Sequence, residues 1–463
     1  MDLTRFRGKS IALLGFGIEN IAVAKLFLKN QIDFIILDRV PVEKMIDDGQ
    51  KLVTSHKLQV KSGEEYLKDL SWFDIIIRSP GVPFLTPEIQ SAKKSGSEIT
   101  SSTKLFFDFC PAQIVGVTGT KGKGTTASII TAIIEQNLKK TVQSAKVYLI
   151  GNIGIAPFEV IEKIKPDDLI VFELSSFQLQ DLDKSPHIAV VVNLADDHLD
   201  YHQTVAEYRT TKQNILKHQN ECDFAVINFD YPESKKLAEF GKAKKYYFSS
   251  KEKITSGAYA DEDGDVLLAF DGEEHKICSQ NELKLIGRHN LENIASAAIV
   301  GKLLNVPNEL ISQAVKEFDG LPHRLEFIRE FDGVKFYNDS FSTNPTPTIA
   351  AIKSFSAPIT IILGGSSKGA DFSELADVIK TSSVKNVLVI GIEGQKIRQE
   401  IIKSLTKINI LNGGKSMEDI VEAAIKHTDN GEIVLLSPAC ASFGMFKNYK
   451  DRGEKFKLAV NNL

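Results

Sequence analysis

Residues 113–126 read QIVGVTGTKGKGTT, an apolar run that passes through a glycine-rich turn into a stretch with helical spacing. An apolar run of this length predicts a buried strand. Backbone N–H groups of the turn can point at an anion held at the N-terminus of the following helix, and Lys123 can reach the β- and γ-phosphates of a nucleotide. Gly116 falls one residue early for the strict phosphate-loop pattern, and Gly124 stands where Ser or Thr usually binds Mg²⁺. We predict a triphosphate site; the alternative is a flexible glycine turn.

The rest of the chain alternates short runs rich in Val and Ile with longer amphipathic stretches. The apolar runs include residues 10–14, 34–37, 74–77, 169–172, 188–192, 359–363, 387–390 and 432–436. Continuous apolar runs are typical of strands covered on both faces, and their alternation with helices predicts βαβ units and parallel sheets. The predicted fold class is therefore α/β.

The length of the chain predicts more than one domain. At 463 residues it exceeds what one hydrophobic core supports, and roughly two to four domains are expected. A Ser/Thr-rich stretch at 95–102 and a Gly-Pro-containing stretch at 319–322 divide it into three. The second domain contains a polar insertion, 242–274, whose Asp-Gly pairs predict antiparallel strands. The predicted domain bounds are 1–100, 101–320 and 321–463.

Composition excludes several classes of protein. Hydrophobic residues make up 43% and charged residues 25%, as in globular proteins. A net charge of −4 gives no overall attraction to nucleic acid or anionic lipid. The four cysteines lie far apart, which argues against a disulfide framework or a structural zinc site. The apolar run 11–18 is too short for a signal peptide and contains two glycines, and no run reaches 18 residues. We expect a cytoplasmic protein with no membrane insertion and no nucleic-acid partner.

A second glycine turn lies near the start of the chain. Gly15 and Gly17 follow the predicted strand 10–14 and open a helical stretch, where glycines permit close approach to a phosphate. Asp38 ends the next strand, where a carboxylate can bind a ribose. Asn20 takes the place of the third glycine of the dinucleotide fingerprint. We interpret the turn as a site for a nucleotide-type ligand; the alternative is a plain strand–helix turn.

Two later segments carry possible metal ligands and acid–base groups. Glu173 ends a predicted strand, which brings its carboxylate to the carboxyl edge of the sheet, and Mg²⁺ prefers a few such oxygens beside phosphate and water. The segment NLADDHLD at 193–200 places His198 among three aspartates. A lone histidine at a strand end is usually structural, but the glycine loop favours a functional one. Lys212, on the next helix, reads by spacing alone as a solvated lysine.

These segments and several others occur in one order along nearly the whole chain. They are TGTKGK at 118–123, GNIG at 151–154, ELSSFQ at 173–178, DHLD at 197–200, GRHN at 287–290 with Asn293, GLPHR at 320–324 and NDS at 338–340. Together they resemble the Mur ligase family, ATP-dependent amino-acid ligases that build the peptide stem of peptidoglycan. The resemblance implies a Rossmann-like N-terminal domain, a central P-loop ATPase-like domain with a mainly parallel sheet, and a Rossmann-like C-terminal domain.

The C-terminal segments indicate which members of the family the chain resembles. They are GG at 364–365, KGADF at 368–372, LSPACASF at 436–443, FKNY at 446–449 and RG at 452–453. They are similar to the members that add D-glutamate to UDP-N-acetylmuramoyl-L-alanine, and no segment like the Asp-Asn-Pro-Arg of the diaminopimelate- or lysine-adding members occurs. The resemblance implies that ATP phosphorylates the acceptor carboxylate and that the amine of D-glutamate then attacks the acyl phosphate. It also implies a monomer that uses two Mg²⁺ ions.

The resemblance assigns roles to individual residues. Those expected at ATP are Gly119, Thr120, Lys121, Gly122, Lys123, Gly124, Thr125, Asn290, Asn293, Arg324 and Asp339. Those expected to hold Mg²⁺ are Glu173, His198, Thr125 and Lys212, the last as a carbamylated lysine, and catalysis is expected from Lys123, Glu173, His198 and Lys212. The UDP-sugar is expected at Gly17, Asp38, Arg39, Ser79, Gly81 and Asn152, and the amino acid at Thr343, Lys368, Ser442 and Tyr449.

Four residues differ from those usual in the family: Lys121, Gly124, Phe341 and Gly444. Phe341 replaces a lysine and Gly444 an aspartate, and both bear on which amino acid is added. One alternative is a related ligase with another acceptor, such as a folylpolyglutamate synthetase, which the first-domain segments around Asp38 and Ser79 disfavour. The other is a non-catalytic nucleotide-binding subunit that lost turnover through Gly124 and Phe341.

Overall fold

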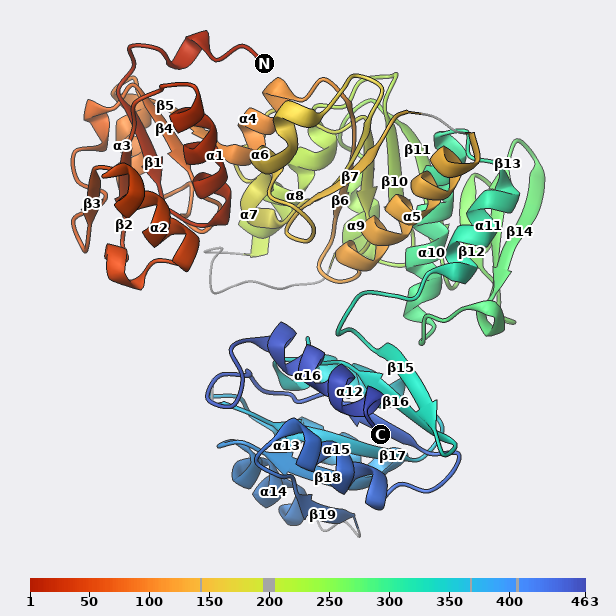
Figure 1. Cartoon of the computed structure of the whole chain (residues 1–463). Helices are drawn as coiled ribbons and strands as arrows, with labels where there is room; N and C mark the ends of the chain where they lie inside the picture. The colour runs from red at the N-terminus through yellow and green to blue at the C-terminus, as the bar shows by residue number, and fades with distance from the viewer. Residues whose placement is uncertain (142–143, 195–204, 367–368, 405–407) are drawn as a thin grey trace. The chain divides into compact units, whose positions relative to one another are not determined.

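The computed structural model describes residues 1–141, 144–194, 205–366, 369–404 and 408–463. Within these residues the chain forms three separate sheets, each flanked by helices (Figure 1). The chain divides into two compact units, one made of 1–280 with 291–315 and the other of 281–290 with 316–463. The first unit contains two sheets and the second contains one. The predicted three-domain α/β fold class is confirmed.

The first sheet is parallel, with strands in the order β3-β2-β1-β4-β5. The strands are β1 (Ile11–Leu14), β2 (Ile35–Asp38), β3 (Val60–Ser62), β4 (Ile75–Arg78) and β5 (Glu98–Ser101). The helices are η1 (Thr4–Phe6), α1 (Ile18–Lys29), η2 (Val42–Lys44), α2 (Asp47–His56), η3 (Leu70–Trp72) and α3 (Pro87–Lys94), followed by α4 (Ser102–Phe109). The strand order reverses between β1 and β4, and ligands bind beyond the carboxyl ends of strands at such a switch point.

The second sheet has the order β14-β13-β12-β11-β10-β9-β6-β8-β7. Its strands are β6 (Gln113–Thr118), β7 (Val147–Gly151), β8 (Leu169–Glu173), β9 (Ile188–Val191), β10 (Phe224–Asn228), β11 (Lys244–Ser249), β12 (Gly257–Ala260), β13 (Asp265–Phe270) and β14 (Glu273–Ser279). Its helices are α5 (Lys123–Thr141), α6 (Pro157–Val160), η4 (Ile161–Lys163), α7 (Ser176–Leu179), α8 (Val205–Lys217), α9 (Pro232–Leu237), η5 (Gln280–Glu282), α10 (His289–Leu303) and α11 (Asn308–Glu317).

The polar insertion differs in part from its prediction. β11 pairs in parallel with β10 and β12, so the parallel sheet extends into the residues that the sequence assigned to antiparallel strands. The antiparallel part consists of β12, β13 and β14. Gly264 and Gly272 turn the chain between them with φ of +84° each, as their Asp-Gly pairs predict. Residues 244–249 read KKYYFS and lack the continuous apolar run of the other parallel strands, so the sequence did not indicate a strand inside a parallel sheet.

The third sheet has the order β15-β16-β20-β17-β18-β19, parallel except at β15. Its strands are β15 (Glu326–Phe331), β16 (Val334–Asn338), β17 (Ile359–Gly364), β18 (Val384–Ile390), β19 (Asn409–Asn412) and β20 (Ile433–Leu436). Its helices are α12 (Pro345–Lys353), α13 (Ser373–Thr381), α14 (Gly394–Lys403), α15 (Met417–Lys426) and α16 (Tyr449–Asn461).

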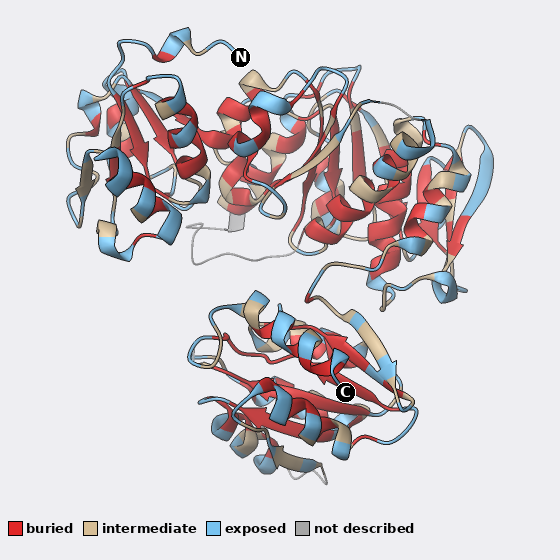
Figure 2. Cartoon of the chain, viewed as in Figure 1, coloured by how far each residue is buried: buried red, intermediate tan, exposed pale blue. Residues whose placement is uncertain are grey.

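Each sheet forms the buried middle layer of its domain (Figure 2). Strands such as β1, β9, β17 and β20 are buried along their whole length, because helices cover both faces. Between the first two sheets, Phe172 of β8 packs edge-on against Phe106 of α4, with ring centroids 5.6 Å apart. Within the described ranges, no helix combines the length and the apolar character needed to cross a membrane.

We predict that Phe172→Ala lowers the free energy of unfolding by roughly 3–5 kcal/mol, because it removes a fully buried ring and leaves a cavity. The matched control is Trp72→Ala: Trp72 is 77% exposed, and the change should stay within about 0.5 kcal/mol. Urea unfolding followed by far-ultraviolet circular dichroism measures both. Equal losses in the two variants would contradict the assignment of this core.

Candidate active site

The glycine-rich loop forms the expected strand–loop–helix unit. β6 ends at Thr118 and α5 begins at Lys123. Gly122 has φ of +83°, and a Cβ there would lie 2.5 Å from Oδ1 of Asn293. Gly119 has φ of +155°, and its Cβ would lie 3.0 Å from backbone atoms of Asn193. Glycine is therefore required at both positions by conformation and by space.

Side chains from distant segments hold this loop. Oδ1 of Asn193 accepts hydrogen bonds from the backbone N–H of Lys121 at 2.8 Å and of Thr120 at 3.2 Å. Asn293, on α10, accepts a hydrogen bond from the hydroxyl of Thr126 at 3.2 Å. These contacts bring Asn293 of the predicted ATP set to the loop. Asn193 has no predicted role, and only its place after a buried strand could have suggested one.

Lys123 lies over the loop. Its ammonium donates to the carbonyl oxygens of Gly119 at 2.9 Å and of Thr120 at 3.0 Å. It is held at the N-terminus of α5, where the helix dipole already favours an anion. The Lys123 ammonium and the N-terminus of α5 therefore both favour an anion bound at the glycine loop.

Lys212 is not the solvated lysine that its spacing suggested. It is only 1% exposed and lies on α8 beside the loop. Its ammonium donates to Oγ1 of Thr118 at 2.8 Å and to the carbonyl oxygen of Gly119 at 3.1 Å. Gly119 O thus accepts from both Lys123 and Lys212, which holds two like charges on one carbonyl. Such an arrangement favours a bound anion, or a covalent modification that removes one of the two positive charges.

Tyr208 is a further residue at this site that sequence reasoning missed. Its hydroxyl lies 3.0 Å from Oγ1 of Thr120, and the ammonium of Lys212 lies 5.5 Å from the centre of its ring. Tyr208 and Lys212 are four residues apart on α8 and so share one face of the helix. That spacing is the signal that could have found it.

Glu173 ends β8, opposite Val117 of β6 in the sheet register. Its side chain is buried at 3% exposure, and Oε1 accepts a hydrogen bond from the amide of Asn152 at 3.4 Å. Oε2 has no hydrogen-bond partner among the described residues. A buried carboxylate oxygen without a donor is costly, and a cation would compensate it. The residue therefore fits the predicted Mg²⁺ ligand.

The predicted metal set is only partly described. His198 lies outside the described residues, and within those residues no group of three or more His, Cys, Asp and Glu side chains could hold a metal ion. Thr125 is buried in the first turn of α5.

The first sheet brings its two predicted binding turns together. Gly15, with φ of +79°, follows β1, and a Cβ there would lie 2.9 Å from Cβ of Ser79, which follows β4. Asp38 accepts hydrogen bonds from the backbone N–H of Phe16 and, at 2.7 Å, of Val40. A Cβ at Gly81 would meet open space, and Arg39 is exposed. These turns lie at the switch point of the sheet, where a nucleotide-type ligand is expected.

Asn20 explains the missing third glycine. It is fully buried, and its amide donates to the carbonyl oxygens of Leu14, Gly15 and Ile77. Its side chain ties the end of β1 to β4, a task for which glycine has no atoms. The departure from the dinucleotide fingerprint thus has a structural cause.

In the second unit, Asp339 follows β16 and is buried. It accepts hydrogen bonds from the hydroxyls of Ser342 and Ser437 and, at 3.2 Å, from the backbone N–H of Leu325. Burial outweighs these bonds and raises the pKa of Asp339 to about 6. The guanidinium of Arg324 lies 4.4 Å from the centre of the Phe341 ring.

A buried arginine on α16 holds the loops of this unit together. Arg452 donates from Nε to the hydroxyl of Ser340 and from Nη2 to the carbonyl of Ser340, while Nη1 donates to the carbonyl of Cys440. The loops after β16 and β20 therefore lie together and carry two of the predicted amino-acid-binding residues, Thr343, half-buried, and Ser442, buried. A third, Tyr449, is half-buried and is the first residue of α16. Lys368 lies outside the described residues. Asn290 belongs to the second unit, whereas Asn293 belongs to the first.

Comparisons with known proteins agree along the whole chain. Three family models match: the Mur ligase MurD-like N-terminal domain over residues 9–101, the Mur ligase middle domain over 117–301, and the Mur ligase glutamate ligase domain over 323–440. The UDP-N-acetylmuramoylalanine–D-glutamate ligase of Acetivibrio thermocellus is 37% identical, with 99% of this chain and 97% of that protein covered. The protein of the same name from Clostridium kluyveri is 37% identical, with 98% and 97% covered.

Solved structures support the fold. The UDP-N-acetylmuramate–alanine ligase of Thermotoga maritima has a TM-score of 0.60 at 17% identity, with 98% of this chain and 99% of that chain covered. MurF from Acinetobacter baumannii has a TM-score of 0.61 at 14% identity, with 99% and 92% covered.

We predict that Asp339→Asn removes a pH dependence of stability. The pKa of Asp339 is about 6 in the folded protein and 3.8 in the unfolded chain, so the folded state holds the proton more tightly. The resulting stabilisation is fully present below pH 3.8 and is lost as the pH rises through 6. At neutral pH the loss amounts to roughly 3 kcal/mol.

Urea unfolding of both proteins at pH 4 and pH 7 measures this difference. The wild-type curve should lose stability relative to the variant between these pH values. Parallel pH profiles would show that Asp339 does not titrate in this range.

Proposed function

The chain belongs to the Mur ligase family, and from that premise we propose that it adds D-glutamate to UDP-N-acetylmuramoyl-L-alanine with ATP as co-substrate. The relatives named UDP-N-acetylmuramoylalanine–D-glutamate ligase match nearly the full chain at 37% identity, and their name supplies the acceptor and the amino acid of this proposal. The single observation that carries it is the position of Lys123 and Lys212 on one carbonyl of the glycine loop, beside Glu173 of the neighbouring strand.

The reaction follows from the chemistry of carboxylates. A carboxylate does not react with an amine at neutral pH, so its oxygen first takes the γ-phosphoryl group, the bond to the β-phosphate oxygen breaks, and ADP forms. The deprotonated amine of D-glutamate then attacks the acyl carbon, the bond from that carbon to the phosphate oxygen breaks, and phosphate leaves as the nitrogen loses a further proton to solvent and the amide forms. Lys123 neutralises charge on the phosphoryl group as it moves, and the loop N–H groups orient it. Most of the rate comes from positioning three substrates in line.

Two Mg²⁺ ions are part of this proposal. Glu173 would hold one with its partnerless oxygen, and His198, Thr125 and a carbamylated Lys212 complete the proposed set. Carbamylation turns the Lys212 ammonium into a carboxylate-like ligand and removes the like-charge contact on Gly119. When bound, the ions supply charge neutralisation around the phosphates.

The remaining roles are proposed from the matching segments. ATP contacts are proposed for Gly119, Thr120, Lys121, Gly122, Gly124, Thr125, Asn290, Asn293, Arg324 and Asp339. The UDP-sugar is proposed at Gly17, Asp38, Arg39, Ser79, Gly81 and Asn152, and D-glutamate at Thr343, Lys368, Ser442 and Tyr449. We further propose that the protein acts as a monomer in the cytoplasm.

An assay with a panel of amino acids tests the proposed reaction. ADP release is measured with ATP, UDP-N-acetylmuramoyl-L-alanine and one amino acid at a time, and omission of the acceptor is the control. We expect that, of the amino acids tested with the acceptor, D-glutamate is the one that gives release above background, because the C-terminal segments are those of the D-glutamate-adding members. Release with a folate acceptor instead would favour the other ligase class, and ATP binding without release for any pair would favour a non-catalytic nucleotide-binding subunit.

The second experiment tests the phosphate loop. Lys123→Ala should slow ADP release at least about 100-fold, since it removes a cation from the transferring group. Calorimetric binding of the UDP-sugar should not change, because five of its six proposed contacts belong to the first domain and the sixth, Asn152, is held by a hydrogen bond to Glu173. The matched control is Lys139→Ala, an exposed lysine at the other end of α5, which should leave both quantities unchanged. Loss of UDP-sugar binding in Lys123→Ala would contradict the division of the two sites.

A further inference from the structure

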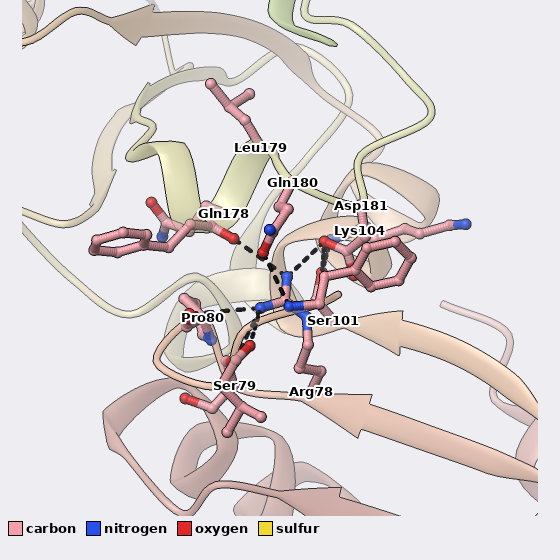
Figure 3. Close-up of polar contacts among 12 residues, drawn as sticks. Arg78, Ser79, Pro80, Ser101, Lys104, Gln178, Leu179, Gln180 and Asp181 are labelled. Carbon is pink, nitrogen blue, oxygen red and sulfur yellow. Dashed lines mark hydrogen bonds and ion pairs between the residues drawn. The ribbon is translucent and has the colours of Figure 1, made fainter. Parts of the chain in front are cut away.

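A fully buried arginine joins the first two sheets. Arg78 is the last residue of β4 and is 0% exposed, and it lies between the turn that follows β4 and the segment 177–181 of the central domain (Figure 3). Its two terminal nitrogens serve different sides. Nη1 donates to the carbonyl oxygens of Val82 at 2.7 Å and Ser79 at 3.3 Å, within the turn itself.

The other nitrogen contacts the central domain. Nη2 donates to Oδ1 of Asp181 at 2.9 Å and to the carbonyl oxygen of Phe177 at 3.2 Å. Asp181 is buried as well, with a side chain 3% exposed, and it also accepts a hydrogen bond from the hydroxyl of Ser101 at 3.3 Å. A planar guanidinium can make both sets of bonds at once, which a point-like ammonium cannot.

Other, partly buried contacts hold the same segment. Gln178 caps α7 and donates at 2.8 Å to the carboxylate of Glu19, in the first turn of α1. Gln180 accepts a hydrogen bond from the backbone N–H of Phe84 at 3.0 Å. The segment starts shortly after Glu173, so the turn 79–82 is connected through Arg78 to the strand end that carries the candidate metal ligand.

We propose that Arg78 is a positioning residue: it sets the turn 79–82 against the segment after Glu173 and thereby fixes where the acceptor carboxylate meets the phosphate site. This inference rests on the proposed function, in which Ser79 and Gly81 hold the UDP-sugar. A buried ion pair is weak evidence for stability, because replacing both partners by apolar residues is often neutral. The geometry of the Arg78–Asp181 pair instead explains why a charged pair is buried here: one arginine shapes the turn 79–82 and orients it toward the phosphate site.

The decisive variant is the double replacement Arg78→Met with Asp181→Leu. It leaves no unpaired charge, so we expect it to fold and to bind ATP with unchanged affinity. Its affinity for UDP-N-acetylmuramoyl-L-alanine, by calorimetry, should fall at least about tenfold, because the turn loses two charge-assisted hydrogen bonds. Its kcat for ADP release should fall on the order of 100-fold, since misplacement of the acceptor affects the transfer step.

Two further variants test whether the effect depends on the guanidinium geometry of Arg78, on its charge, or on any contact between the two domains. Arg78→Lys keeps the charge without the fork, and it should also bind the UDP-sugar more weakly. Lys29→Met is the matched control: Lys29 of α1 pairs with Glu162 of η4 across the same two domains at 2.8 Å, but both side chains are largely exposed. This variant should keep wild-type kcat, KM and UDP-sugar affinity.

The outcomes distinguish this inference from the proposed function. A folded double variant with unchanged UDP-sugar affinity and kcat would overturn the role of Arg78, as would full activity of Arg78→Lys. If the double variant does not fold, Arg78→Lys decides the question by the same measurements. A wild-type protein that binds the UDP-sugar but releases no ADP would refute the proposed reaction, and the calorimetric comparison would still decide the inference. Absence of UDP-sugar binding in the wild type would overturn both.

Discussion

The register of β6 in the central sheet is the constraint on which the candidate site depends. β6 lies between β8 and β9, all three strands run parallel, and Val117 stands opposite both Glu173 and Val190. The glycine loop, the Glu173 carboxylate and the segment after β9 therefore leave the sheet at one edge. A slip of one residue would turn every side chain of β6 to the other face. Two contacts specific to this register oppose such a slip: a Cβ at Gly116 would lie only 2.6 Å from Cγ of Pro186, and the hydroxyl of Thr118 donates to the carbonyl oxygen of Leu174 at 2.8 Å.

Features with local causes could be predicted from the sequence. Glu173 stands at the end of an apolar run and Lys123 at the end of the glycine turn that follows one, so strand period and turn chemistry locate them without knowledge of the partners. The same holds for Gly15 and for the parallel class of the sheets. The extent of the parallel central sheet was missed at β11, because its sequence KKYYFS lacks the continuous apolar run that marks the other parallel strands.

Features with tertiary causes could not be predicted from the residues alone. Lys212 is polar and helical, and only the packing of α8 against the loop buries it. Asn193 contacts the backbone of Lys121 and Arg78 contacts the backbone of Phe177, both far away in the chain, and no spacing rule connects them to those atoms. Arg452 in the second unit is of the same kind, since it holds two loops through their carbonyl groups. Such residues become visible only when hydrogen-bond partners are known.

The shared carbonyl of Gly119 has a consequence for how the protein meets its ligands in solution. The whole chain carries a net charge of −4, which would repel a nucleotide at long range. The Lys123 ammonium at the N-terminus of α5 creates a local positive field of short reach, to which Lys212 adds only while it is unmodified. At physiological ionic strength the distant charges are screened over about 8 Å, so capture of ATP is governed by this local field. Inorganic phosphate and sulfate respond to the same field, and buffers that contain them compete with the nucleotide.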